Sequence, residues 1–179
     1  NTTTLQSDGS ARVIRMASTS RLDGFTITGG DAAGSAYQSG YGGGVLIFYA
    51  SGAVLENCMI TGNSAKYGAG VGVRNNITDN SNPERIINCT VDGNTMNVEE
   101  GHGAGMMLME RPYTVVEDTV FSNNTMTELA KFDIGGGGVS ALAWSVGPGH
   151  PEFYRCEFTA NYSSSNGGGM AIRASNAAS

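Results

Sequence analysis

The chain has 179 residues, of which 10 are Lys or Arg and 16 are Asp or Glu, and its formal charge at pH 7 is −6. This length suits one domain with a sizeable core, so residues 1–179 are expected to form a single domain. Nucleic acid and anionic membranes are held by clustered cations, and an acidic chain with few lysines argues against both as partners. The longest purely apolar run, residues 45–50, is far shorter than the roughly 20 residues that cross a bilayer, so no membrane insertion of this segment is expected.

Glycine accounts for 27 residues, about twice its usual share of roughly 7%. With 40% hydrophobic residues the chain is able to fold, so the glycines are not a sign of disorder. They point to a repeat architecture, and internal self-similarity is the first feature to look for.

A nine-residue motif recurs five times along the chain. It consists of an apolar residue, two variable residues, a small or apolar residue, a polar residue, an apolar residue, two small residues and Asn, with Gly in place of the final Asn in the first copy. The copies, in chain order, are residues 22–30, 55–63, 86–94, 116–124 and 153–161. A period of about 30 to 37 residues is typical of repeat proteins, both helical and β.

Each copy is followed by a glycine cluster and an alternating apolar pair, at residues 42–47, 68–73, 103–108, 136–141 and 167–172. Apolar residues that alternate with a period of two beside β-branched or aromatic neighbours predict strands. Ankyrin and tetratricopeptide arrays need helices of about ten residues or more, which the pattern does not offer. The chain is therefore expected to be all-β, a parallel β-solenoid of about five coils.

Equivalent residues of a solenoid stack in columns from coil to coil. Two columns are expected to point inward. The first consists of Phe25, Cys58, Cys89, Thr119 and Cys156. The second consists of Ile27, Ile60, Val91, Phe121 and Phe158. A third column of Asn63, Asn94, Asn124 and Asn161 lies at a turn. Asn tolerates left-handed backbone, and its amide both donates and accepts, so this column predicts a structural ladder that satisfies turn backbone groups.

The Asn-containing motif resembles a repeat of a known family. Phe121–Asn124 and Phe158–Asn161 read Phe-x-x-Asn, and an aliphatic residue replaces Phe in Ile60–Asn63 and Val91–Asn94. Followed by a glycine cluster, this pattern resembles the polymorphic outer-membrane protein repeat of chlamydial surface proteins, with Gly-Gly-Gly or Gly-Ala-Gly in place of the family's Gly-Gly-Ala. Residues 21–30 are similar to the first coils of bacterial right-handed parallel β-helix proteins of the pectin-lyase-like type.

The resemblance covers roughly residues 20–175 and implies a single-stranded right-handed parallel β-helix. This architecture hosts adhesins, autotransporter passengers, phage tailspikes and polysaccharide lyases, so the resemblance bears on fold more than on function.

Candidates for catalysis come from two patterns. Gly101-His102-Gly103 is similar to an element of polygalacturonase-like β-helix enzymes, but the Asn-Thr-Asp and Asp-Asp elements of that activity do not occur in the chain. Glu56 and Glu117 share a column two coils apart, about 10 Å by strand spacing, which would suit the carboxylates of an inverting glycosidase. Solvated face residues explain the same acids more simply, so no catalytic residue is assigned and His102, Glu56 and Glu117 stay candidates.

The chain offers no pattern for a metal or cofactor. Cys58, Cys89 and Cys156 fall in an inward column, where free thiols act as small hydrophobic side chains. Cys58 and Cys89 lie on neighbouring coils and could approach disulfide distance, but the Cβ vectors of in-register parallel residues are poorly aimed for a disulfide, so all three are interpreted as free and structural. No Cys/His cluster has metal-ligand spacing. The Ca²⁺ that the lyase resemblance would bring needs a dense set of carboxylates, which the motif does not provide.

Aromatic residues gather in the gaps between motifs and beside the glycine strand. They are Tyr37, Tyr41, Phe48, Tyr49, Tyr67, Tyr113 and Trp144. Exposed aromatic faces hold sugar rings or protein partners, although such rings also cover the ends of loops. The residues assigned to ligand binding are Tyr37, Tyr41, Tyr113, Trp144 and His150.

The function expected from these features is that of a non-catalytic, adhesin-like module, extracellular or on the bacterial cell surface. It would bind a polysaccharide, or a host or bacterial surface protein, through its loops and act as a rigid spacer. The alternative is a polysaccharide lyase or glycoside hydrolase whose catalytic residues lie partly outside this stretch. Neither end shows a solenoid cap, so the stretch is expected to belong to a longer exported protein.

Overall fold

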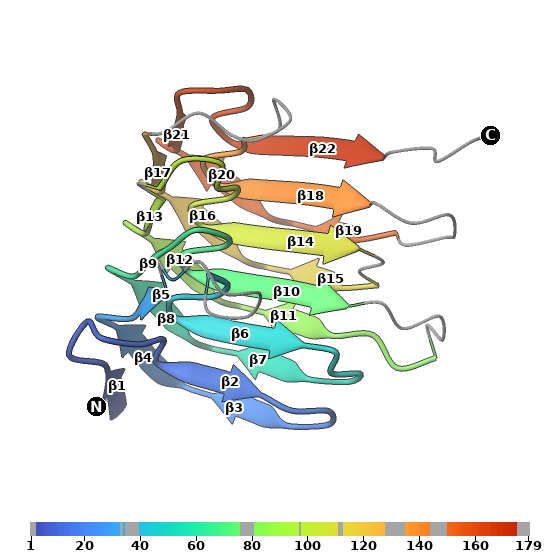
Figure 1. The fold of residues 1–179 in the computed structure, drawn as a ribbon. Helices are drawn as coiled ribbons and strands as arrows, with labels where there is room; N and C mark the ends of the chain where they lie inside the picture. Colours follow the sequence, from blue (N-terminus) through green and yellow to red (C-terminus); the bar gives the residue numbers. More distant parts are fainter. Residues whose placement is uncertain are drawn as a thin grey trace.

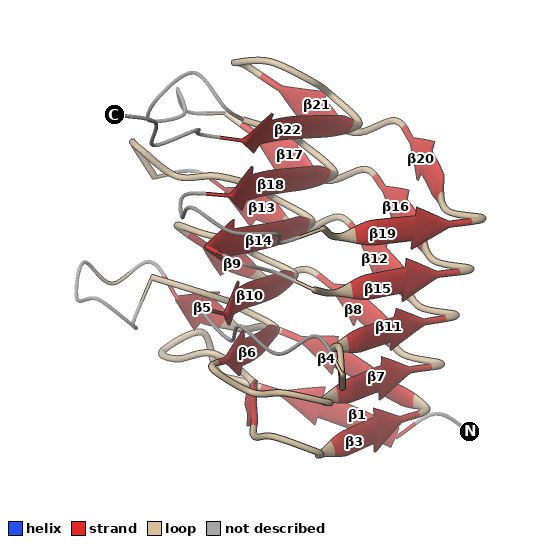
Figure 2. Ribbon diagram, turned by 90° about the vertical axis from the view of Figure 1, so that its right-hand side faces the viewer, coloured by secondary structure: helices blue, strands red, loops and turns tan. Residues whose placement is uncertain are grey.

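A computed structural model describes residues 3–32, 34, 40–75, 81–96, 98–110, 113–127, 135–143 and 150–174. Within these ranges the chain forms 22 short strands and no helix. The strands stack in parallel into four sheets that enclose a rod (Figures 1 and 2). The expected all-β solenoid is confirmed.

Two of the four sheets have six strands and two have five. Sheet A holds β1 (Thr3–Gln6), β4 (Phe25–Thr28), β8 (Met59–Thr61), β12 (Thr90–Asp92), β16 (Val120–Ser122) and β20 (Glu157–Thr159). Sheet B holds β2 (Ile14–Met16), β6 (Val45–Phe48), β10 (Val71–Asn75), β14 (Met106–Glu110), β18 (Val139–Ala143) and β22 (Met170–Ala174). Sheet C holds β3 (Arg21–Asp23), β7 (Val54–Glu56), β11 (Arg85–Ile87), β15 (Val115–Glu117) and β19 (Glu152–Tyr154). Sheet D holds β5 (Asp31–Ala32), β9 (Ser64–Ala65), β13 (Thr95–Met96), β17 (Thr125–Met126) and β21 (Tyr162–Ser163).

One strand from each sheet makes a coil, in the order C, A, D, B (Figure 2). Coils 1 to 5 are β3–β6, β7–β10, β11–β14, β15–β18 and β19–β22, and β1 and β2 stack beside coil 1. The nine-residue motif supplies the strands of sheets C and A, and the glycine cluster leads into sheet B. The expected count of about five coils is therefore confirmed.

The core is built from the two inward columns of sheet A and the alternate residues of sheet B. Ile27, Ile60, Val91 and Phe121 are fully buried, and Phe121 stacks on the ring of Phe158 in coil 5 with centroids 5.1 Å apart. Sheet B contributes Val45, Ile47, Val71, Val73, Met106, Leu108, Val139 and Ala141 to the same cluster. Both predicted columns are confirmed.

The column of asparagines is a continuous hydrogen-bonded ladder. Asn63 Nδ2 donates to Asn94 Oδ1 at 3.0 Å, Asn94 Nδ2 to Asn124 Oδ1 at 3.0 Å, and Asn124 Nδ2 to Asn161 Oδ1 at 2.9 Å. Each Oδ1 also accepts a backbone N–H of the preceding coil, as Asn94 Oδ1 does from Asn63 at 3.1 Å. Asn63, Asn94 and Asn124 are buried, so the ladder satisfies turn groups that water does not reach.

Replacing Asn94 with Ala is expected to lower the free energy of unfolding by about 1–3 kcal/mol, because it leaves buried turn groups without partners. Asn82, an exposed residue just before β11, is the matched control, and its replacement by Ala should cost no more than about 0.5 kcal/mol. Urea unfolding followed by far-ultraviolet circular dichroism measures both. Equal losses at the two positions would show that the ladder carries no special stability.

The glycine clusters recur because neighbouring coils approach closely beside the Asn ladder. A Cβ added to Gly70 would lie 2.5 Å from the carbonyl oxygen of Gly105 and 3.0 Å from Asn94 Nδ2. At the start of the first three clusters Gly42, Gly68 and Gly103 have left-handed backbone, with φ of 59°, 64° and 66°. The glycines thus make both the turn into sheet B and the contact between coils.

Candidate functional site

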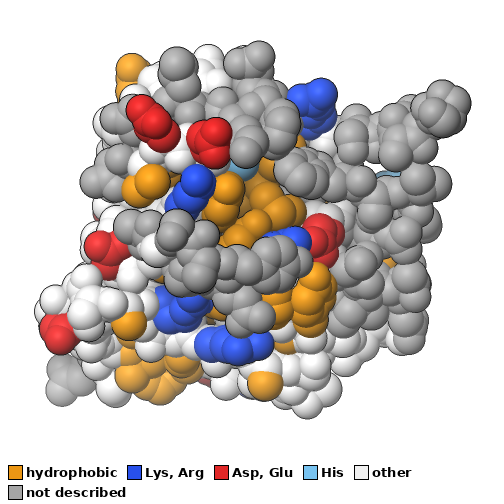
Figure 3. Space-filling model, in the orientation of Figure 1, with side chains coloured by type: hydrophobic (Ala, Val, Ile, Leu, Met, Phe, Trp, Pro, Cys, Tyr) orange, Lys and Arg blue, Asp and Glu red, His pale blue; other side chains and the backbone are white. Residues whose placement is uncertain are grey.

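The outer face of sheet B carries an apolar cluster together with arginine side chains, because Arg15 pairs with Leu46 and Arg74 pairs with Phe48. Residues that point away from the core on β6, β14 and β18 are nevertheless buried; they are Leu46, Phe48, Met107, Met109 and Leu142. Figure 3 views the molecule from this side and shows hydrophobic side chains near the middle of the face, with Lys and Arg side chains beside them. We call these residues, together with Tyr41, Tyr67, Arg74 and His102, the sheet B face.

Three rings stack along the edge of the sheet B face, one from each of coils 1 to 3. Tyr41, Tyr67 and His102 each lie four residues before a strand of sheet B and form successive parallel β-bridges. The ring centroids of Tyr41 and Tyr67 are 4.6 Å apart, and those of Tyr67 and His102 are 5.8 Å apart. Tyr67 is half-buried, while His102 is only 1% exposed. The stack results from coil register, since equivalent residues must lie above one another.

Arg74 of β10 contacts both aromatic rings and a carboxylate on the sheet B face. Its guanidinium carbon lies 5.4 Å from the centroid of Tyr41 and 6.0 Å from that of Phe48, within cation–π range. Its Nε donates to Glu110 Oε1 at 2.7 Å, and the two side chains are only 11% and 16% exposed. Tyr41 completes the group, because its hydroxyl contacts Met109 Sδ at 2.9 Å.

This arrangement suits recognition better than proton transfer. A guanidinium stays protonated at any ordinary pH, and here it is oriented by Glu110. The rings of Tyr41 and Phe48 are buried, so a partner can reach this group through the partly exposed side chains of Arg74 and Tyr67.

The catalytic candidates are not brought together. Glu56 and Glu117 both flank Ile87 on sheet C, as their column predicted, but each forms an ion pair. Glu56 pairs with Arg21, and Glu117 accepts from Arg85 NH2 at 3.2 Å. His102 lies in the ring stack beside sheet B.

Some of the residues expected to bind a ligand through exposed side chains are buried, and others are exposed. Tyr41, Phe48 and Tyr113 are buried, so the expectation that their rings lie open on the surface is wrong. Phe48 is part of β6, and Tyr41 and Tyr113 lie in the segments that lead into β6 and β15, so their side chains pack against the solenoid. His150 is exposed. Tyr37 and Trp144 lie outside the described residues.

A buried carboxylate lies at the corner between sheets B and C. Glu84 is 1% exposed; Asn75 Nδ2 donates to its Oε1, and Thr114 Oγ1 lies 3.4 Å from its Oε2. Asn75 Oδ1 has no partner among the described residues. Burial raises the pKa of Glu84, because the charged form loses its hydration.

Glu84→Gln is expected to raise the free energy of unfolding at about pH 7.5, because Gln stays neutral in the buried site. The raised folded-state pKa means that the stability owed to the neutral carboxyl is complete below the unfolded-state pKa of about 4.3 and is lost as pH rises through the folded-state value. The variant and the unchanged chain should therefore converge near about pH 4. Urea unfolding at both pH values tests this, with Glu117→Gln as the surface control. A loss of stability in Glu84→Gln at the higher pH would contradict it.

No group of three or more His, Cys, Asp and Glu side chains suited to a metal ion occurs in the described part of the chain. The described residues also contain no helix long and apolar enough to cross a membrane.

The coils, the Asn ladder and the inward columns define the class of protein as a parallel β-solenoid with an apolar cluster on one outer face. The family described as the right-handed β-helix region matches residues 3–179, and the chain belongs to this family. No curated protein and no solved structure matches the chain significantly.

Proposed function

We propose that this chain is a non-catalytic β-helix module, secreted or at the cell surface, that binds a polysaccharide or a surface protein and acts as a rigid spacer. The observation that carries the proposal is the accessible part of the sheet B face, where the partly exposed side chains of Arg74 and Tyr67 lie beside the buried rings of Tyr41 and His102. The similarity of its repeats to those of polymorphic outer-membrane proteins supports a place at the bacterial surface.

The ion pairs on sheet C favour binding over catalysis. Proton abstraction or glycoside cleavage requires ionisable groups that converge on one substrate. Glu56 and Glu117 are each engaged by an arginine on sheet C, whereas His102 lies beside sheet B. The alternative of a lyase or hydrolase draws no support from these three candidates.

The proposal is tested by passing the purified chain over immobilised uronate and neutral polysaccharides and over bacterial and host cell surfaces. Retention without new reducing ends or ultraviolet-absorbing unsaturated products is the expected result. Product that disappears in His102→Ala or Glu117→Gln would overturn the non-catalytic assignment.

Matched substitutions locate the binding surface. Arg74→Gln and Tyr67→Ala are expected to weaken binding about tenfold, which corresponds to roughly 1.4 kcal/mol. Arg85→Gln removes a similar inter-coil ion pair on sheet C, and Tyr154→Ala removes an exposed ring there. These two controls should bind like the unchanged chain. Equal losses in both pairs would show that the sheet B face is not the binding surface.

A further inference from the structure

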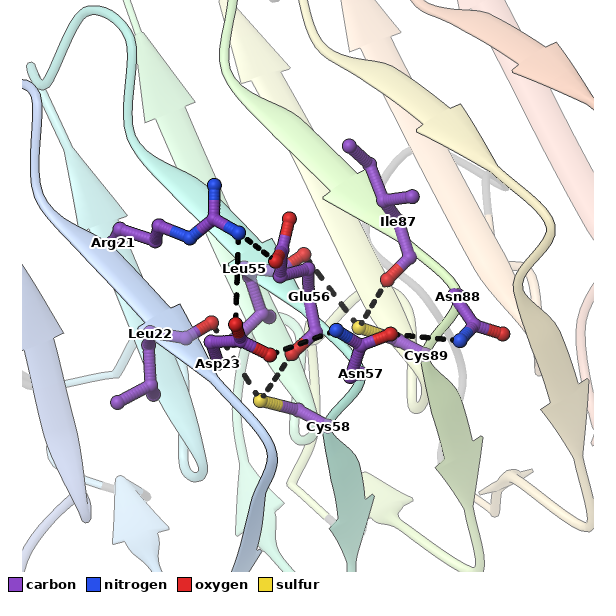
Figure 4. A network of polar contacts seen from close by, with 10 residues as sticks. All are labelled: Arg21, Leu22, Asp23, Leu55, Glu56, Asn57, Cys58, Ile87, Asn88 and Cys89. Carbon is purple, nitrogen blue, oxygen red and sulfur yellow. Dashed lines mark hydrogen bonds and ion pairs between the residues drawn. The ribbon is translucent and has the colours of Figure 1, made fainter.

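The corner between sheets C and A carries a polar ladder on its surface. Asn57 and Asn88 occupy it with left-handed backbone, at φ of 51° and 49°. Asn57 Nδ2 donates to Asp23 Oδ1 at 2.7 Å, and Asn88 Nδ2 donates to Asn57 Oδ1 at 2.7 Å. Figure 4 shows this chain of amides, with the thiols of Cys58 and Cys89 close by. Both cysteines are buried.

The three cysteines and Thr119 of the inward column that begins with Phe25 each cap a carbonyl of their own turn. Cys58 Sγ lies 3.1 Å from the carbonyl oxygen of Glu56, and Cys89 Sγ lies 3.3 Å from that of Ile87. Thr119 does the same with a hydroxyl, which donates to the carbonyl of Glu117 at 2.9 Å. The position therefore accepts any small donor, and serine is a conservative replacement for cysteine there.

Cys58 and Cys89 occupy equivalent register positions on neighbouring coils. Met59 pairs with Thr90, and the backbone N–H of Thr90 donates to the carbonyl of Cys58 at 2.9 Å. Paired parallel strands lie about 4.8 Å apart, within the Cα separation of about 4.4–6.8 Å that disulfides span.

Each thiol also shifts the ionisation of the other. The pKa of Cys58 is lowered to about 7, mainly because the Cys89 thiol can donate to its sulfur. The pKa of Cys89 is raised, mainly by the same contact with Cys58 and then by burial. Deprotonation is therefore easier at Cys58 than at Cys89, and Cys58 is the sulfur expected to attack first.

We propose that Cys58 and Cys89 are a redox modification site, at which a small-molecule disulfide converts the two thiols into a covalent link between coils 2 and 3. The Cys58 thiolate attacks one sulfur of the small disulfide, forms a mixed disulfide and releases one small thiolate. The Cys89 sulfur, after losing its proton to solvent, then attacks Cys58 and releases the second. Two protein thiols are oxidised, and one small disulfide is reduced to two thiols.

Cys156 provides the internal control. It lies in the same column, but Thr119 of coil 4 separates it from Cys89. It caps the carbonyl of Tyr154 at 3.4 Å as the pair caps its own carbonyls, but it is half-buried and has no thiol neighbour, so it is the more accessible of the three cysteines. Cys156 should form mixed adducts at most.

The test exposes the reduced full chain to oxidised glutathione, both in the folded state and during refolding from urea, so that burial of the thiols cannot hide the reaction. Alkylation, intact mass and peptide mapping follow. The unchanged chain and Cys156→Ser should each lose two hydrogens and yield a peptide that joins Cys58 to Cys89, whereas Cys58→Ser and Cys89→Ser should not. The cross-linked form should unfold about 5–15 °C higher, reversibly with dithiothreitol.

Two results would overturn the proposal. One is full alkylation of both Cys58 and Cys89 after oxidation by either route. The other is a cross-link that involves Cys156, which would show that contact between coils 2 and 3 does not direct the reaction.

Discussion

Gly70→Ala is expected to destabilise the chain by about 3 kcal/mol, because the added methyl group enters the contact between coils 2 and 3. Its Cβ would lie 2.5 Å from the carbonyl oxygen of Gly105 and 2.8 Å from Val91 Cγ1. A backbone carbonyl cannot swing aside as a side chain can, so coils 2 and 3 would have to separate locally. Urea unfolding measures the loss.

Gly169 is the matched control, since it occupies the same position in coil 5. A Cβ there meets only Phe158, with the nearest atom at 3.5 Å, an ordinary van der Waals distance. Gly169→Ala should therefore change the free energy of unfolding by no more than about 0.5 kcal/mol. A similar loss at Gly70 and Gly169 would mean that backbone conformation, rather than coil contact, requires glycine in this column.

Phe121→Ala is expected to cost about 3–5 kcal/mol, because it opens a cavity in the middle of the inward column. Phe121 is fully buried, with Thr119 in the same coil and Phe158 stacked on its ring. Phe158→Ala removes the same side chain from coil 5, where the ring is half-buried, and should cost about half as much. Equal losses would contradict the position of coil 5 at the edge of the core.

The fold was predictable because its causes are local and repeated. One motif occurs five times and places Ile60 and Val91 in one column and Asn63 and Asn94 in another. Because the coils stack in register, these columns determine the core and the ladder. The apolar cluster on sheet B was less evident, although the runs Val45–Phe48 and Met106–Met109 are unbroken by polar residues. Such runs indicate strands that are buried on both sides.

The parts that escaped prediction depend on contacts between coils. Arg74 and Glu110 are 36 positions apart and meet only because coils 2 and 3 stack in register. Nothing beside Glu84 marks it as buried, since its surroundings come from Asn75 and from Thr114 of the next coil. Tyr41 was misjudged because it was treated as part of a gap, whereas its backbone already bridges to coil 2.

The limited sequence separation of the strand pairs bears on how such a rod can lengthen. Paired residues are 22 positions apart at Thr3 and Phe25 and 37 apart at Val115 and Glu152, and no sheet formed by the described residues joins more distant parts of the chain. Each coil therefore closes a loop of similar length, at a similar entropic cost, however many coils precede it. The average separation of contacting residues stays constant as coils are added, so relative contact order falls and the folding search does not become harder. The length of a protein built this way is set by its number of coils, because each coil adds about 4.8 Å along the axis of the rod.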